Sequence, residues 1–384
     1  MKQFDKKFIL LANYLPDRQE SMQRYALNLR DSLHAEQVEA EIWRPTVFFG
    51  AFVKNTNAGM GKWLAYLDKY MLFPALLWLR VRVNSKYMEK GLFFHICDHS
   101  NSPYLGFLPS GRAGITCHDV LAIRGSLGFE DAYTPATSAG KLLQRWILNH
   151  LRRAKILTAV SQHTMNGLLE LCNHTKPLGA RWKMIYNSFN GDFKPMPLPD
   201  CQKRLAAHGI SADVPFVLSV GSAAARKNRK LLLDMLHCLG KQWNGRICFA
   251  GAPMDPALLD YAAQLGLKDR ISVVVRPGHD TLVALYSACT AFVFPSFSEG
   301  FGWPLIEAQA CGAPVLASNI LPMPEVSRGS AVHANPHSPA DFAHAFLDIL
   351  VPENRNKLIE KGFQNCKRFK PQLISRQFLD LYSS

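Results

Sequence analysis

The chain has 384 residues, of which 48% are hydrophobic and 19% charged, so its composition is that of a globular protein and excludes an intrinsically disordered one. This length suits two domains of under about 200 residues each. The formal net charge is +14, and it is concentrated in the first half: residues 1–195 carry 25 Lys and Arg against 15 Asp and Glu, whereas residues 196–384 carry 19 against 15. The first half is therefore expected to face something anionic, either a membrane surface, a phosphorylated substrate or a nucleic acid.

Targeting and redox features are sparse. The early apolar run at residues 8–12 is too short for a signal peptide, and no stretch reaches the roughly 18–20 apolar residues of a transmembrane helix. The nine cysteines occur singly, without a C-x-x-C pair, which indicates reduced thiols. We therefore expect a cytoplasmic protein.

The first half alternates strand-like and helix-like segments. Its apolar runs predict strands at 7–13, 39–45, 92–97, 113–119 and 155–161, and its periodic segments predict helices at 21–33 and 140–154. Residues 62–82 form an aromatic, amphipathic and basic stretch that is interrupted by Pro74. Such a stretch is typical either of a segment lying in a membrane interface or of a helix pair that packs within the domain.

The second half repeats the pattern more regularly. Strands are predicted at 215–221, 246–251, 271–275, 291–296 and 313–318, and helices at 229–240, 255–266, 281–289 and 304–312. Near-continuous apolar strands separated by helices indicate a parallel sheet covered on both faces. The proline-rich segment 190–200 has no periodicity and marks a domain boundary.

Three loops at predicted strand ends carry candidate binding groups, because ligands of such sheets lie at the carboxyl ends of the strands. In "GSAAARKN" (221–228), small residues after Gly221 leave room for a phosphate at a helix start, with Arg226 and Lys227 as its cations. The alternative for this stretch is a solvated basic loop. In "VVVRPGHD" (273–280), Arg276 either contacts a nucleotide base or belongs to an ordinary turn.

The third loop is "FPSFSEGFGWPLIEAQACGAPVLAS" (294–318). Pro304 suits the first position of a helix, which places Glu307 in the first helical turn and Glu299 in the preceding loop. A carboxylate accepts two hydrogen bonds, as the vicinal hydroxyls of a sugar or ribose require. The alternative role for Glu307 is stabilisation of the helix dipole. Glu299, beside the flexible Gly300 and Gly302, has no comparable structural explanation.

The segments "GSAAARKN" (221–228), "PSFSEGFGWPLIEAQACGAPVLAS" (295–318) and "MPEV" (323–326), in this order, resemble the retaining glycosyltransferases of family 4, which have the GT-B fold, in their R-K-N variant. Weaker likenesses are "CHDV" (117–120), "TAVSQHT" (158–164) and "IYNSFN" (185–190) in the first half, and "FKPQLISRQFLDLY" at the C-terminus. The resemblance implies an α/β protein with two Rossmann-like domains facing each other across a cleft. Residues 1–194 would bind the acceptor and 195–366 the nucleotide-sugar donor, with a helix in 367–384 packing back on the first domain.

The resemblance also implies residue roles. Lys227, with Arg226 or the backbone of Gly221 and Ser222, would hold the donor diphosphate, and Glu299 and Glu307 would bind the donor sugar and the ribose. His118 would lie across the cleft, near the transferred sugar; its alternative is a core histidine at a strand end. Donor contacts are further expected from Arg276, Gly300, Phe301 and Gly302.

One segment departs from the family pattern. The glycine-rich first loop of the family is replaced by "QESMQRY" (19–25), in which only Arg24 and Tyr25 match. No D-x-D motif is present, so we expect cations and not a metal to stabilise the leaving diphosphate. His95, Asp98 and His99 form the alternative, a metal cluster.

The predicted activity is transfer of a hexose or deoxyhexose from a GDP-, UDP- or dTDP-sugar to a glycan or lipid-linked saccharide, as a mannosyltransferase does in lipopolysaccharide or other surface polysaccharide synthesis. No cofactor is expected, and peripheral membrane contact would come from residues 62–82. The alternatives are a non-catalytic nucleotide-sugar-binding protein of the same fold and a nucleic-acid binder, for which no motif is present. The sequence leaves the sugar, base and acceptor open.

Overall fold

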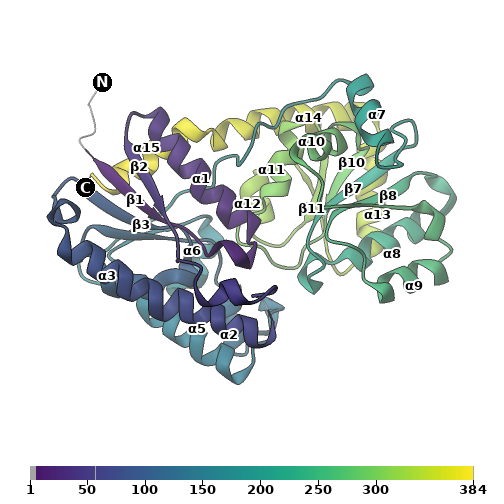
Figure 1. Cartoon of the computed structure of the whole chain (residues 1–384). Coiled ribbons are helices and arrows are strands. Elements are labelled where there is room, and N and C mark those ends of the chain that lie inside the picture. Colours follow the sequence, from purple (N-terminus) through teal and green to yellow (C-terminus); the bar gives the residue numbers. More distant parts are fainter. Residues whose placement is uncertain (1–5, 57, 384) are drawn as a thin grey trace. The chain divides into compact units, whose positions relative to one another are not determined.

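The computed structural model describes residues 6–56 and 58–383 (Figure 1). The chain divides into two compact units, residues 1–190 with 371–384, and residues 191–370. The division lies four residues before the boundary that the sequence suggested, and the C-terminal segment of the first unit begins at Pro371 and not at residue 367.

The first unit contains a six-stranded parallel sheet with the order β2-β1-β3-β4-β5-β6. The strands are β1 (Lys7–Leu11), β2 (Glu39–Trp43), β3 (Leu92–Ile96), β4 (Ala113–Cys117), β5 (Ile156–Ala159) and β6 (Arg181–Met184). The sequence identified the first five. It missed β6 because this edge strand has no fully buried residue and therefore lacks an apolar run.

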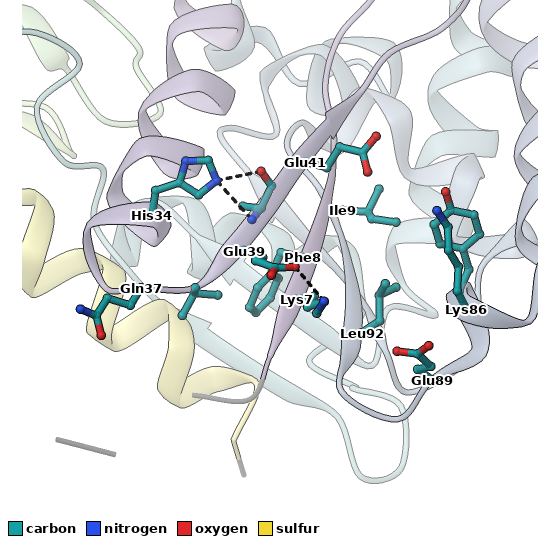
Figure 2. A pocket seen from close by; sticks show the side chains of 13 residues that line it. Lys7, Phe8, Ile9, His34, Gln37, Glu39, Glu41, Lys86, Glu89 and Leu92 are labelled. Atoms are coloured by element: carbon teal, nitrogen blue, oxygen red, sulfur yellow. Dashed lines mark hydrogen bonds and ion pairs between the residues drawn. The ribbon is translucent and has the colours of Figure 1, made fainter. Parts of the chain in front are cut away.

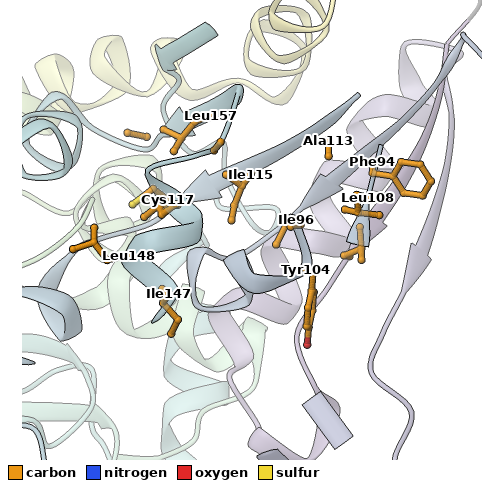
Figure 3. Close-up of a cluster of buried hydrophobic side chains, with 14 of the residues drawn as sticks. Phe94, Ile96, Tyr104, Leu108, Ala113, Ile115, Cys117, Ile147, Leu148 and Leu157 are labelled. Carbon is orange, nitrogen blue, oxygen red and sulfur yellow. The ribbon is translucent and has the colours of Figure 1, made fainter. Parts of the chain in front are cut away.

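Helices cover this sheet. They are α1 (Glu20–Ala35), α2 (Gly59–Leu67), α3 (Phe73–Val83), α4 (Leu121–Ser126), α5 (Ser138–Leu151), α6 (Gln162–Leu171) and α15 (Pro371–Leu381). In β1, Ile9 and Leu11 join one buried cluster, and Phe8 and Leu10 join another. Since successive side chains of a strand point to opposite faces, both faces of the sheet are covered. Figure 3 shows the first cluster, in which residues of β3, β4 and β5 meet Ile147 and Leu148 of α5.

The C-terminal helix α15 belongs to the second cluster. Its Phe378 ring lies 5.5 Å from that of Phe8 on β1, and α15 packs along α1 (Figure 1). The apolar side chains of this C-terminal helix are thus buried against the first sheet, although the residues just before the helix belong to the second unit.

The second unit contains another six-stranded parallel sheet, with the order β12-β11-β10-β7-β8-β9. The strands are β7 (Phe216–Gly221), β8 (Arg246–Gly251), β9 (Ile271–Val275), β10 (Ala291–Phe294), β11 (Val315–Ser318) and β12 (Val332–Ala334). The sequence missed only β12, a three-residue edge strand. Together the two sheets confirm the expected α/β fold with two Rossmann-like units.

The helices of this unit are α7 (Leu198–Ala206), α8 (Arg229–Leu239), α9 (Pro256–Gln264), α10 (His279–Ala288), α11 (Trp303–Ala310), α12 (Met323–Ser327), α13 (Pro339–Leu350) and α14 (Pro352–Cys366). On α8 the predicted apolar face is confirmed, because Leu232, Met235, Leu236 and Leu239 are all buried. Figure 1 shows α8, α9 and α13 on one side of the sheet, and α7, α10 and α14 on the other.

Strand order reverses once in each sheet. In the second sheet the chain runs outward from β7 to β9 and then returns to β10, on the other side of β7. In the first sheet the reversal lies between β1 and β3. Because adjacent loops leave in opposite directions at such a point, they open a crevice at the carboxyl ends of the strands, where ligands bind. A binding site is therefore expected at the loops after β7 and β10 in the second sheet, and at those after β1 and β3 in the first.

Candidate functional site

An ion-pair cluster occupies the reversal point of the second sheet. Arg226 and Lys227 lie in a 3₁₀ turn (Ala225–Lys227) after β7, and Glu299 lies in the loop after β10. Lys227 Nζ is 2.6 Å from Glu299 Oε1, and Arg226 Nη1 is 2.8 Å from Glu299 Oε2. The sequence suggested that these residues share a site; it did not suggest that one carboxylate pairs with both cations.

Burial makes this cluster electrostatically strong. The side chain of Glu299 is 9% exposed, that of Lys227 13% and that of Arg226 24%. Burial by itself would raise the pKa of the Glu299 carboxyl, but Lys227 and Arg226 outweigh it and hold that pKa below its ordinary value. Burial lowers the pKa of Lys227, and the nearby guanidinium of Arg226 adds to this effect against the opposing carboxylate. The cluster thus holds two cations and one anion, with a net positive charge for an anionic ligand.

Hydrogen bonds to backbone carbonyls fix the two loops to each other. The Phe297 N–H donates to the Arg226 carbonyl at 2.8 Å, and the Arg226 guanidinium donates to the Ser298 carbonyl at 2.9 Å. The Asn228 amide donates to the carbonyls of Pro295 and Pro336. The positions of Arg226 and Glu299 therefore follow from a rigid loop pair and not from free side-chain rotation.

Two glycines allow the strand ends to approach each other. Gly221 and Gly251 are partners in the β7–β8 ladder, with φ of 146° and 120°. A Cβ on Gly251 would lie 2.5 Å from the Gly221 carbonyl oxygen, and one on Gly221 would lie 3.3 Å from Lys227 Cε. Only glycine fits this geometry, and it lets the Lys227 side chain run along the end of β7.

Arg229 is a structural residue of the site that the sequence reading missed. Its buried guanidinium donates to the carbonyls of Gly221 at 2.8 Å, Ala252 at 3.1 Å and Pro253 at 3.0 Å. It therefore joins the loops that follow β7 and β8. A signal was present in the sequence, since Arg229 lies three residues before Leu232 and seven before Leu236, on the apolar side of α8.

The helix α8 starts at the predicted residue 229, and α11 starts one residue before its predicted start at 304. The helix α8 begins at Arg229, so Arg226 and Lys227 precede it by a 3₁₀ turn and do not lie at its start. The helix α11 begins at Trp303, so Glu307 is its fifth residue and lies beyond the first turn. In both cases a residue in the left-handed region, Asn228 or Gly302, bends the chain at the N-cap of the helix.

Glu307 is buried and accepts a hydrogen bond of 3.0 Å from the hydroxyl of Tyr286 on α10. Burial, and after it the Glu307 carboxylate, raises the pKa of that hydroxyl, which therefore stays a donor. The expected alternative, stabilisation of the helix dipole from the first turn, is wrong for this position. One carboxylate oxygen is oriented by Tyr286, and the ribose role of Glu307 stays a prediction.

The other residues predicted to contact the donor differ in their exposure and backbone conformation. Ser222 is exposed in the loop after β7, and Arg276, with φ of 49°, is exposed after β9, its N–H bonded to the Gly251 carbonyl. Gly302 has φ of 99°. The ring of Phe301 is only 4% exposed and packs on Phe369, so a donor contact would come from its backbone. Gly300 lies between Glu299 and this packed ring.

In the first unit, His118 lies directly after β4 and is buried. Its Nε2 is 2.8 Å from the Cys97 carbonyl, which makes that nitrogen the donor, and its ring meets that of Tyr25 edge-on at 4.5 Å. Burial lowers the pKa of His118 against the opposing effect of Asp98. The residue is thus a neutral, oriented imidazole at the carboxyl end of the sheet; its role toward a transferred sugar stays a prediction.

A polar cluster that the sequence reading did not assign lies beside His118, at the reversal point of the first sheet. Asn13 follows β1 and donates to Asp98, after β3, at 2.5 Å. Asp98 also accepts from the Ser100 N–H, and His99 Nδ1 lies 3.4 Å from it. Burial would raise the pKa of Asp98, but the neighbouring histidines and these donors lower it.

The alternative of a metal cluster is not supported by this geometry. His95 bonds Thr116 and Tyr382, each at 2.7 Å, and does not join Asp98 and His99. Among residues 6–56 and 58–383, no group of three or more His, Cys, Asp or Glu is arranged to hold a metal ion.

The segment that departs from the family loop, residues 19–25, forms the first turns of α1 instead of a flexible loop. Tyr25, one of the two matching residues, bonds Thr116 at 2.7 Å beneath His118. The Gln19 side chain accepts from Asn13, so it joins the polar cluster.

A cavity of about 600 Å³ opens elsewhere in this unit, between β1, β2 and the segment around Lys86 (Figure 2). Its lining includes Lys7, Glu39 and Leu92, which start their strands, so it lies at the amino ends of the sheet. Ligands of parallel sheets bind at the opposite ends, and we do not assign the site here.

Comparison with known proteins agrees with this picture of the second unit. Residues 202–365 match the model of the family described as glycosyl transferases group 1. The chain is 27% identical over 346 residues to the O-antigen chain mannosyltransferase RfbU of Salmonella typhimurium, covering 88% of each chain. It is 25% identical over 276 residues to the O-antigen chain mannosyltransferase B of Escherichia coli, covering 71% of this chain and 70% of the relative.

Solved structures share the fold over almost the whole chain. Sucrose-phosphate synthase from Thermosynechococcus elongatus superposes with a TM-score of 0.73 at 19% identity, covering 98% of each chain. Anabaena HepE, in complex with UDP and glucose, superposes with a TM-score of 0.70 at 17% identity, covering 99% of this chain and all of its own. The chain thus has the two-unit α/β fold of these structures, and residues 202–365 match the model of glycosyl transferases group 1.

Proposed function

We propose that the protein is a retaining glycosyltransferase that moves a hexose or deoxyhexose from a nucleoside-diphosphate sugar to a glycan or lipid-linked saccharide. The observation that carries the proposal is the pairing of Glu299 with both Arg226 and Lys227 at the reversal point of the second sheet. A ligand with a diphosphate and a sugar presents both kinds of group that this cluster is suited to bind.

The diphosphate takes the place of the carboxylate at the cations. Arg226 has a planar guanidinium that grips two phosphate oxygens, and Lys227 supplies a compact charge close to the end of β7. The backbone around Gly221 and Ser222 leaves room for the phosphates. Once the diphosphate has neutralised Arg226 and Lys227, Glu299 is released to accept hydrogen bonds from the sugar hydroxyls, and Glu307 binds the ribose.

The reaction breaks the bond between the anomeric carbon and the diphosphate oxygen, and that oxygen keeps the electron pair. The acceptor hydroxyl forms the new bond on the face from which the diphosphate departs and gives its proton to the leaving diphosphate oxygen, so the anomeric configuration is retained. Negative charge grows on the leaving oxygen, where Arg226 and Lys227 are already in place and stabilise it. These cations serve the role that a divalent metal has in other transferases.

The sugar is proposed from the relatives. Two of them are named O-antigen chain mannosyltransferases, which supports mannose from a GDP-sugar and an acceptor in surface polysaccharide or lipopolysaccharide synthesis. HepE is described in complex with UDP-glucose, so a UDP-sugar is the competing donor. The nine cysteines, none of them disulfide-bonded, support a cytoplasmic location, where nucleotide sugars serve as donors.

A panel of nucleotide sugars tests this proposal. The purified protein is heated with GDP-mannose, UDP-glucose, UDP-N-acetylglucosamine or dTDP-rhamnose, and the rise in melting temperature identifies the donor. Release of the nucleoside diphosphate is then followed with a lipid-linked or glycan acceptor. A non-catalytic binding protein would show the thermal shift without release. A protein that responds to none of these donors would contradict the proposal.

A further inference from the structure

One face of the first unit is unusually apolar for a surface that faces water. The helices α2 and α3, joined by a π-helical stretch (Asp68–Leu72), form one continuous helical segment beside α5 (Figure 1). Seven large apolar side chains of this segment are 41–78% exposed, namely Met60, Trp63, Met71, Leu76, Trp78, Leu79 and Val83. We call these seven residues the α2–α3 face.

The spacing shows that this exposure is a property of the helix and not of a frayed end. Met60, Trp63, Met71 and Trp78 recur at intervals of three, eight and seven residues, which return to the same side of a helix, whereas Val83 is the last residue of α3. The opposite side is already buried in the core of the unit through Ala65, Phe73, Leu77 and Val81. The segment is therefore apolar on two sides, and only one of them is covered by the residues that the structure describes.

Buried polar contacts hold the segment in place. The Asp68 carboxylate, which is fully buried, accepts from the Tyr14 hydroxyl at 2.6 Å and from the N–H groups of Phe48, Phe49 and Gly50. Burial by itself would raise the pKa of Asp68, but these donors outweigh it and hold that pKa below its ordinary value. Lys69 next to it pairs with Asp17 at 2.6 Å. The apolar face is thus presented by a fixed helix.

The charges around the face are mostly positive, although Arg80 pairs with Glu41 at 3.8 Å. Residues 44–90 contain eight Lys and Arg and only two acids, Asp68 and Glu89, of which Asp68 points inward. Lys62, Arg82 and Lys86 are exposed on the same helical segment and on the turn that follows it. Trp and Met side chains with a border of Lys and Arg are typical of a helix that lies in the headgroup region of a bilayer.

We infer that the α2–α3 face docks on the anionic surface of a lipid membrane, with its apolar side chains among the acyl chains and Lys62, Arg82 and Lys86 at the lipid phosphates. The positive charge decides between a membrane and a second copy of the chain. A symmetric dimer through this face would bring the same cations of two copies together and leave them without acids. This inference rests on the first unit alone and does not depend on the proposed transferase activity.

Vesicle flotation tests the inference with the full chain and no donor. One set of vesicles is pure phosphatidylcholine, and the other contains about one third phosphatidylglycerol. We expect binding to the anionic vesicles that falls by at least tenfold when salt is raised to about 0.5 M, because salt screens the cations. Replacing Lys62, Arg82 and Lys86 by Gln lowers the partition coefficient on anionic vesicles by roughly fivefold per residue.

The apolar contribution has its own variant and control. Trp63→Ser combined with Leu79→Ser lowers binding to anionic vesicles at least tenfold, whereas Leu178→Ser, at a residue of the same unit that is 98% exposed, leaves it unchanged. Melting curves establish that all variants fold. The inference is contradicted if Trp63→Ser/Leu79→Ser and the triple Gln variant bind anionic vesicles as well as the unmodified chain does, or if the unmodified chain binds neither kind of vesicle. A dimer seen by ultracentrifugation and lost in Trp63→Ser/Leu79→Ser would instead assign the face to a second copy.

Discussion

Lys227 Nζ and Glu299 Oε1 lie 2.6 Å apart, and the same carboxylate also pairs with Arg226, so the side chain expected to bind sugar holds the side chains expected to bind diphosphate. The two functions predicted for this site are therefore coupled. A ligand phosphate competes with Glu299 for the cations, and its arrival changes what Glu299 is free to bind. This coupling is the basis of the first prediction.

Glu299→Gln should separate the two steps. It leaves Arg226 and Lys227 buried without their carboxylate, and we expect the free energy of unfolding of the second unit to fall by about 1–3 kcal/mol. A nucleoside diphosphate should restore more stability to this variant than to the unmodified chain, because no carboxylate competes with it. Transfer activity should fall at least a hundredfold, since the sugar loses its carboxylate. Melting with and without the diphosphate measures the first effects, and product release measures the last.

Asp234→Asn is the matched control for Glu299→Gln. Asp234 pairs with Lys230 on α8, where the lysine side chain is 57% exposed. Surface pairs contribute about 0–1 kcal/mol, so this variant should keep both stability and diphosphate response. Full transfer activity of a Glu299→Ala variant would overturn the site assignment.

Gly251→Ala tests the close approach of β7 and β8. A Cβ would lie 2.5 Å from the Gly221 carbonyl oxygen, so the strand ends must separate and the loop with Lys227 must move. We expect a loss of at least about 3 kcal/mol in unfolding free energy, or failure to fold. In Gly266→Ala the backbone also has positive φ, but no atom lies within 4 Å of the added Cβ. That control should lose only about 1–2 kcal/mol, which equilibrium unfolding in urea resolves.

Arg229→Lys tests whether the loops after β7 and β8 depend on three hydrogen bonds from one guanidinium. A lysine has the charge but not the planar fork, so at least one carbonyl among Gly221, Ala252 and Pro253 loses its donor. The expected cost is about 1–3 kcal/mol in unfolding free energy, together with weaker donor binding. Lys230→Met, at an exposed neighbouring position, should leave donor binding unchanged, as isothermal titration can establish. If Arg229→Lys binds donor as tightly as the unmodified chain, Arg229 has no role in shaping the site.

His95 makes the first unit sensitive to acid. Burial, and after it repulsion from His118 when both rings are protonated, lowers the pKa of His95 to about 3, below its value of about 6.5 in the unfolded chain. The unfolded state therefore binds a proton between these pH values and the folded state does not. The contribution of His95 to the free energy of unfolding is fully present above about pH 6.5. As the pH is lowered from there, the free energy of unfolding falls by roughly 1.4 kcal/mol per pH unit. The urea midpoint measured between pH 5 and 8 should show this slope.

His95→Gln removes a group that takes up a proton on unfolding. The free energy of unfolding should therefore depend less on pH between pH 5 and 6.5. The variant is expected to be less stable at pH 7, because the bonds of His95 to Thr116 and Tyr382 are altered. The slope and not the absolute stability therefore decides. An unchanged slope would show that other groups control the response to acid.

Local patterns predicted the elements well where burial leaves a clear signature. Apolar runs such as 216–221 and 291–294 identified their strands because both faces of each sheet are covered by helices. The strands β6 and β12 escaped because neither has an apolar run: β6 has no fully buried residue, and β12 is only three residues long. The start of α11 at Trp303 was misplaced by one residue because the left-handed Gly302 before it sets the start, and that backbone conformation is not visible in the sequence.

The sequence by itself determined the types of element, the identity of the candidate cations and carboxylates, and their place at strand ends, because these depend on residue spacing along the chain. Only the tertiary structure decided which of them meet. Glu299 reaches Arg226 and Lys227 because β10 lies beside β7 in the sheet, and Asn13 reaches Asp98 because β3 lies beside β1. Strand order arises from the packing of whole units, in which every helix must cover a strand face, and no local pattern records it.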